Sequence, residues 1–112
     1  MTFVWTNYRM KMELKIAGFD WDDGNREKCQ RHGVAIEVIE ELFSRAVAIE
    51  PDPSPIEKRV RAIGKTGNGR SVFLVFTLRE LYGENFIRPI SARYMHKKEI
   101  QSYEEENPDA QQ

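Results

Sequence analysis

The sequence has little cysteine and histidine and no long hydrophobic run. Its single cysteine, Cys29, excludes an internal disulfide framework and is typical of a reducing compartment. One cysteine and two distant histidines, His32 and His96, do not supply the ligands of a structural zinc site. No apolar run approaches the roughly 20 residues that a membrane-spanning helix needs, and the first residues show no signal-peptide pattern. We therefore expect a cytoplasmic protein without metal, cofactor or membrane contact.

The elements that are present predict one small domain of the α+β class. At 112 residues, the chain suffices for one core around one sheet. We expect an N-terminal extension at 1–12, a single domain at 13–106 and an acidic tail at 107–112. Alternating apolar residues predict strands, and helical spacing of apolar residues predicts helices. The expected strands cover 13–21, 46–49, 57–65, 70–79 and 86–93, and the expected helices cover 24–31, 35–44 and 95–106.

Turn residues mark how these elements are connected. Gly33 suits the left-handed end of the first helix, and the prolines of 51–55 predict a loop. Thr66-Gly67-Asn68-Gly69 predicts a hairpin turn, so the following strands pair antiparallel. Pro89 lacks an amide donor and predicts an edge or a bulge in the last strand. The sequence thus indicates a mainly antiparallel sheet of four to five strands, with two helices in the N-terminal half and one at the C-terminus.

Charge is segregated along the chain, although the net charge is only −1. Residues 57–98 hold ten Lys and Arg against three acids, a balance of +7, whereas residues 13–55 and 99–112 each carry −5. A basic segment of this kind favours a polyanionic ligand on one surface. The alternative is a solvated sheet edge that is protected by charge.

The arginines are the main candidates for chemistry, because no phosphate-binding glycine loop, nucleophile elbow or paired-histidine metal helix is present. Metal-free RNA cleavage requires positioning of the 2′-hydroxyl, stabilisation of charge on the phosphate and proton transfer. A planar guanidinium can donate two parallel hydrogen bonds to two oxygens of one phosphate. Arg79 and Arg93 are therefore candidate catalytic residues, and this hypothesis requires them to lie together without carboxylate partners. An ion pair between Arg93 and Glu99 is the structural alternative.

Further basic side chains are candidates for RNA binding or for structural roles. His32 is a candidate general base, because histidine is the usual residue for proton transfer in catalysis. The alternative, which we favour, is a helix-end histidine that contacts carbonyls. Tyr103 is a second possible proton carrier. The candidate RNA-binding residues are Arg59, Arg61, Arg88 and Lys97.

An ordered set of short motifs resembles the BrnT-type toxins. These motifs span most of the chain, from Phe19 to Tyr103, and the ordered set is more specific than any piece. They are Phe19-Asp20-Trp21-Asp22, Asn25, Lys28, Arg31-His32-Gly33-Val34, Arg59-Val60-Arg61-Ala62-Ile63-Gly64, Gly69-Arg70, Thr77-Leu78-Arg79, Ile90-Ser91-Ala92-Arg93, Glu99 and Tyr103.

The resemblance implies a RelE-like fold and a ribonuclease toxin of a type II toxin–antitoxin pair. It also implies a BrnA-like antitoxin with a DNA-binding ribbon-helix-helix, so that DNA is contacted only through the antitoxin, and a homodimer or a toxin–antitoxin hetero-oligomer. It supports Arg79 and Arg93 as catalytic residues and Arg59 as a phosphate contact. Two alternatives stay open: a catalytically weak homologue that binds the antitoxin in an autoregulatory complex, and a basic RNA-binding module. Pro89 and the loop at 51–55, where the sequence departs from the family pattern, motivate the first.

Overall fold

The computed structural model describes residues 2–6, 11–45, 47–51 and 58–106. Most of the loop expected at 51–55, the tail at 107–112 and part of the N-terminal extension lie outside these residues. The strands are β1 (Thr2–Thr6), β2 (Lys11–Lys15), β3 (Gly18–Phe19), β4 (Val47–Pro51), β5 (Val60–Lys65), β6 (Ser71–Leu81) and β7 (Glu84–Tyr94). The helices are α1 (Asp23–Gln30), α2 (Ile36–Leu42) and α3 (Lys97–Glu106).

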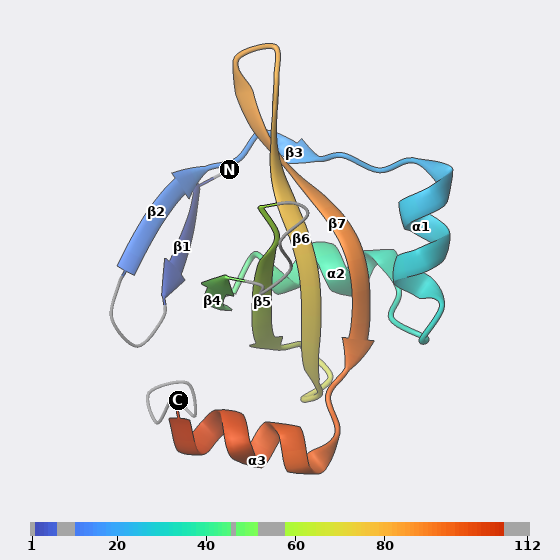
Figure 1. Cartoon of the computed structure of the whole chain (residues 1–112), viewed down its shortest axis with the longest axis vertical. Helices are drawn as coiled ribbons and strands as arrows, with labels where there is room; N and C mark the ends of the chain where they lie inside the picture. The colour runs from blue at the N-terminus through green and yellow to red at the C-terminus, as the bar shows by residue number, and fades with distance from the viewer. Residues whose placement is uncertain (1, 7–10, 46, 52–57, 107–112) are drawn as a thin grey trace.

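The strands form one sheet in the order β2-β1-β4-β5-β6-β7-β3 (Figure 1). Strands β4 to β7 pair antiparallel and form its centre, whereas β1 pairs parallel with β4 and β3 pairs parallel with β7. Two helices precede the central strands and one follows them. This arrangement confirms the α+β class and the mainly antiparallel sheet. The sheet is widened to seven strands by β1, from the expected extension, and by the division of the first expected strand.

The hydrophobic core lies between the central strands and the first two helices. Alternate residues of β6, Val72, Leu74 and Phe76, are buried, as the period of a strand requires. Phe43, which follows α2, meets Phe76 edge to face with ring centroids 5.3 Å apart. Cys29 of α1 is fully buried in the same cluster, where it packs as a small apolar residue. No helix in the described part of the chain is long and apolar enough to cross a membrane.

The strand expected at 13–21 is wrong in extent. Strand β2 ends at Lys15 on one edge of the sheet, and β3 begins at Gly18 on the opposite edge. From Ala17 onwards the backbone hydrogen-bonds to the hairpin of β6 and β7. The amide of Ala17 donates to the carbonyl of Asn85, and the amide of Asp20 donates to the carbonyl of Ile87, at 2.8 Å each. This crossing places Asp20 beside β7 and so matters for the site.

The bulge expected at Pro89 is present. Val75 pairs with Ser91 and Phe76 pairs with Pro89, so Ile90 is an extra residue in β7. The side chain of Pro89 is fully buried. A bulge reverses the alternation of side chains along a strand. Arg88 therefore shares a face with Ser91, whereas a regular strand would place these two residues on opposite faces.

Candidate functional site

A groove with a volume of about 690 Å³ lies where the start of α1 meets β6 and β7. It draws residues from four separate parts of the chain, which the sheet brings together. Its lining residues are Asp22, Gly24, Asn25, Lys28, Lys58, Arg59, Thr77, Leu78, Arg79, Arg88, Pro89 and Ile90.

The groove is rich in positive charge. Five of its lining side chains are cationic, and Asp22 is its single acidic one. The structure brings together three of the candidate arginines, Arg59, Arg79 and Arg88, and adds two lysines that were not among the candidate catalytic or RNA-binding residues. Guanidinium and ammonium groups in one groove suit an anionic ligand with several phosphates.

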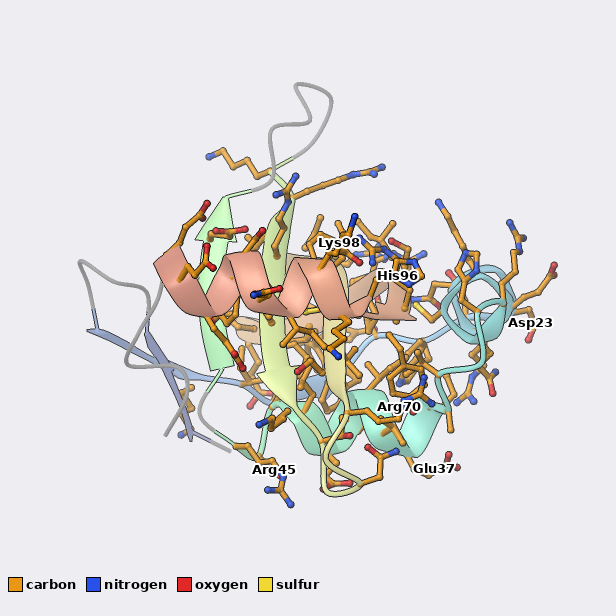
Figure 2. The ribbon with its side chains drawn as sticks, turned by 90° about the horizontal axis from the view of Figure 1, so that it is seen from below. Asp23, Glu37, Arg45, Arg70, His96 and Lys98 are labelled. Carbon is orange, nitrogen blue, oxygen red and sulfur yellow. The ribbon has the colours of Figure 1, made fainter. Side chains whose placement is uncertain are left out.

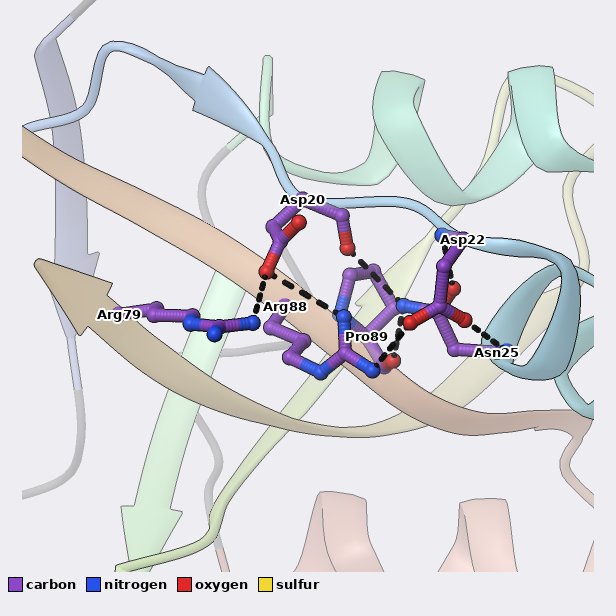
Figure 3. Close-up of polar contacts among 6 residues, drawn as sticks. All are labelled: Asp20, Asp22, Asn25, Arg79, Arg88 and Pro89. Carbon is purple, nitrogen blue, oxygen red and sulfur yellow. Dashed lines mark hydrogen bonds and ion pairs between the residues drawn. The ribbon is translucent and has the colours of Figure 1, made fainter. Parts of the chain in front are cut away.

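Two of these arginines are held in a chain of ion pairs with two aspartates (Figure 3). Asp20 accepts from Arg79 at 2.8 Å and from Arg88 at 3.2 Å through the same oxygen, Oδ2. The other terminal nitrogen of Arg88, Nη2, donates to Asp22 at 2.6 Å. Arg79 and Arg88 therefore both reach one anionic oxygen, which is the arrangement that a phosphate oxygen needs.

The electrostatics of the chain follow from these hydrogen bonds. The backbone amide of Asn25 and then the guanidinium of Arg88 lower the pKa of the Asp22 carboxyl below its usual value. The hydrogen bond with Asp22 in turn raises the pKa of Arg88. Asp22 therefore stays ionised near neutral pH and is a counter-charge, not a proton donor.

The sheet register explains why the two arginines meet. Arg88 pairs directly with Thr77 across β6 and β7, and Arg79 follows Thr77 by two residues, so both arginines leave from one face. Strand β3 then places Asp20 next to Ile87 of β7. The site depends on this parallel pairing between segments almost 70 residues apart in sequence.

A buried amide anchors the bulge to the start of α1. The Nδ2 of Asn25 donates to the carbonyls of Asp20 at 2.9 Å and Pro89 at 3.0 Å. Its Oδ1 accepts from the amide of Asp22 at 2.7 Å, while the Asp22 carboxylate accepts from the amide of Asn25 and closes a capping box. Asn25 thus fixes both aspartates relative to β7.

Arg93 does not lie in this groove, and the requirement that it should lie beside Arg79 without a carboxylate partner is not met. Arg93 pairs with Phe73 across the sheet, so six residues, about 20 Å of strand, separate its position from that of Arg79. Both nitrogens of its fork donate to Glu99 of α3, at 2.7 Å each. The guanidinium groups of Arg93 and Arg61 lie 4.8 and 5.5 Å from the Phe73 ring centroid. The geometry favours the structural alternative for Arg93, which fastens α3 to the sheet.

The remaining sequence candidates also lie outside the groove lining. His32 is exposed in the turn after α1, where Gly33 adopts the expected positive φ of 87°. Lys97 is the first residue of α3. In Figure 2, this end of α3, labelled by His96 and Lys98, lies apart from Asp23 at the start of α1. Burial raises the pKa of Tyr103 to about 12, which makes its hydroxyl a poor base near neutrality. Among the described residues, no three or more His, Cys, Asp and Glu side chains are grouped to hold a metal ion.

The ion pair between Arg93 and Glu99 should make the stability of the protein depend on pH. Hydrogen bonds from Arg93 and from the amide of His96 lower the pKa of Glu99 from 4.5 to about 2. Because folding favours the ionised carboxylate, its contribution to stability is complete above about pH 4.5 and is lost as the pH falls towards about 2. We expect Glu99→Gln to unfold at a lower urea concentration than wild type near neutral pH, with the difference shrinking below about pH 4.5. Glu105→Gln on the same helix is the control, and a difference that is constant with pH would contradict the assignment.

Comparison with known protein families places the chain in one of them. The family model described as "Ribonuclease toxin, BrnT, of type II toxin-antitoxin system" matches residues 21–99, more than half of the chain. No curated protein matches the sequence significantly. The matched segment contains α1, β5 to β7 and all five groove cations, of which Lys28, Arg79 and Arg88 lie in α1, β6 and β7 and the other two lie just before β5. The chain therefore belongs to the BrnT family of ribonuclease toxins of type II toxin–antitoxin systems.

Proposed function

We propose that this protein is a metal-independent endoribonuclease that binds single-stranded RNA in the groove and cleaves it there. The observation that carries the proposal is the convergence of Arg79 and Arg88 on a single carboxylate oxygen of Asp20. A phosphate that replaced the Asp20 carboxylate at that position would be held by two forks, while the other groove cations, Lys28, Lys58 and Arg59, supply charge for neighbouring phosphates. The proposed active site therefore centres on Arg79 and Arg88.

The reaction needs charge stabilisation more than covalent chemistry from the protein. The 2′-oxygen attacks the adjacent phosphorus, the bond from phosphorus to the 5′-oxygen breaks, and one proton passes in net from the 2′-oxygen to the leaving 5′-oxygen. Negative charge gathers on the other two phosphate oxygens in the transition state. Arg79 and Arg88 would stabilise this charge, and Asp20 and Asp22 would keep both forks oriented before RNA binds.

The proposal is tested by expression and by cleavage in vitro. Induced expression of the wild-type protein in bacteria should stop growth by inhibiting translation, and the purified protein should cleave single-stranded RNA in the presence of EDTA. Unimpaired growth together with intact RNA would contradict the proposal. Activity that disappears with EDTA and returns with a divalent cation would contradict metal independence alone.

A type II toxin has an antitoxin partner, and we propose a BrnA-like ribbon-helix-helix protein in the cytoplasm for this role. Within such a complex the antitoxin would contact operator DNA. A reading frame for such a protein next to this gene, and a stable complex of the two purified proteins, would support the assignment.

A second candidate function is a catalytically weak antitoxin-binding component of an autoregulatory complex. The observation in its favour is that two arginines of the site, Arg79 and Arg88, already have carboxylate partners. A purified protein that binds its antitoxin tightly but leaves RNA intact would favour this function over the first.

A further inference from the structure

The tip of the hairpin between β6 and β7 carries an aromatic side chain that the fold does not use. Tyr82 is 99% exposed. In the described part of the chain the other exposed large hydrophobic residue is Leu78, and its exposed fraction is only 40%. The two strands of this hairpin are the longest of the sheet, and the tip extends beyond the rest of the molecule (Figure 1). The ring of Tyr82 therefore contributes nothing to the core.

The backbone at the tip makes tyrosine an unfavourable choice for folding. Tyr82 and Gly83 form the two-residue turn with φ values of 54° and 75°, the combination of a type I′ hairpin. Glycine and asparagine adopt such a conformation readily, but a bulky residue does so only with strain. A residue that is strained and wholly exposed suggests a role in contact with another molecule.

The tip is separated from the groove by only a few residues of the hairpin. Tyr82 follows Arg79 by three residues along the same hairpin, and Arg79 lines the groove. Glu80 and Glu84 flank the tip and are exposed, so the tip itself disfavours a phosphate. What it offers to a strand leaving the groove is the face of an aromatic ring, on which any nucleobase can stack.

We propose that Tyr82 is a stacking platform for one base of the single-stranded RNA whose phosphates lie in the groove. This inference rests on the proposed function and adds a contact outside the reacting centre. The ring would hold the strand in register with Arg79 without reading a particular base, because stacking tolerates every base.

The test uses the full chain and two short single-stranded oligonucleotides without 2′-hydroxyls, so that neither is cleaved. One carries a fluorescent 2-aminopurine and ordinary bases, and the other has the same phosphates with abasic sites. Tyr82→Asn removes the ring but keeps a residue suited to positive φ, so its melting temperature should equal or exceed that of wild type. Tyr82→Phe keeps the ring and is the matched control.

We expect Tyr82→Asn to bind the base-carrying oligonucleotide about 10-fold more weakly than wild type and to lose the quenching of 2-aminopurine, while Tyr82→Phe binds as wild type does. The abasic oligonucleotide should not distinguish the three proteins. Equal affinity of wild type and Tyr82→Asn for the base-carrying strand would overturn the inference, as would equal weakening for both strands. Salt-independent or absent binding of both strands by wild type would instead contradict the proposed function, and this inference with it.

Discussion

Replacing Arg88 with alanine is expected to lower the rate of RNA cleavage by about 10²-fold or more. Arg88 bridges Asp20 and Asp22 and shares an oxygen of Asp20 with Arg79, so its loss removes one of the two forks at the proposed phosphate position. Arg88→Lys should recover part of the rate, because a lysine keeps the charge but lacks the planar fork. The measurement is the single-turnover cleavage rate of a defined single-stranded RNA.

The matched control for this experiment is Arg31→Ala. Arg31 is the exposed residue that follows the last turn of α1. It pairs with Glu27 at 3.4 Å, outside the groove. Its loss should leave cleavage unchanged, since exposed pairs of this kind contribute little. Thermal melting of each variant separates a lost activity from a lost fold. Cleavage by folded Arg88→Ala at the wild-type rate would remove Arg88 from the mechanism.

Replacing Asn25 with alanine is expected to lower the free energy of unfolding by about 3 kcal/mol. The substitution removes the side-chain half of the capping box, in which Oδ1 of Asn25 accepts from the amide of Asp22, and two hydrogen bonds to the carbonyls of Asp20 and Pro89. The contact with Pro89 is buried, so the carbonyl would be left without its partner away from water. Because Asn25 also fixes the aspartates relative to β7, the folded fraction of the variant should cleave RNA more slowly. Urea unfolding measures the first effect.

Gln30 provides a control of the same chemistry in the same helix. Its amide donates to the carbonyl of Arg26 at 3.1 Å on the exposed surface. Gln30→Ala should change the free energy of unfolding by no more than about 0.5 kcal/mol. If Asn25→Ala were no more destabilising than Gln30→Ala, the anchoring role of Asn25 would be wrong.

Much of the fold could be predicted because its signals are local. Helical spacing of apolar residues placed α2, and the Gly33 and Pro89 signals predicted a left-handed helix end and a bulge that are both present. The spacing of Arg93 and Glu99, only six residues apart, was also enough to suggest their ion pair.

The composition of the site could not be predicted in the same way, because it depends on topology. Asp20 lies 59 and 68 residues from Arg79 and Arg88, and nothing local indicates that β3 leaves β2 and pairs parallel with β7. In the sequence, Asp20 and Asp22 stood out only as members of a motif that resembles the BrnT-type toxins. The sequence therefore identified the basic residues of the groove in part but neither their carboxylate partners nor the exclusion of Arg93.

Mapping where single-stranded nucleic acid contacts the protein tests most directly whether RNA binds in the groove. Backbone amide signals of the ¹⁵N-labelled protein can be followed by NMR while a 2′-deoxy oligonucleotide is added at low salt. We expect the largest shifts at groove residues such as Gly24, Thr77 and Ile90, and we expect these shifts to be lost in Arg88→Ala. Shifts confined to α2 or α3, with an undisturbed groove, would contradict binding in the groove.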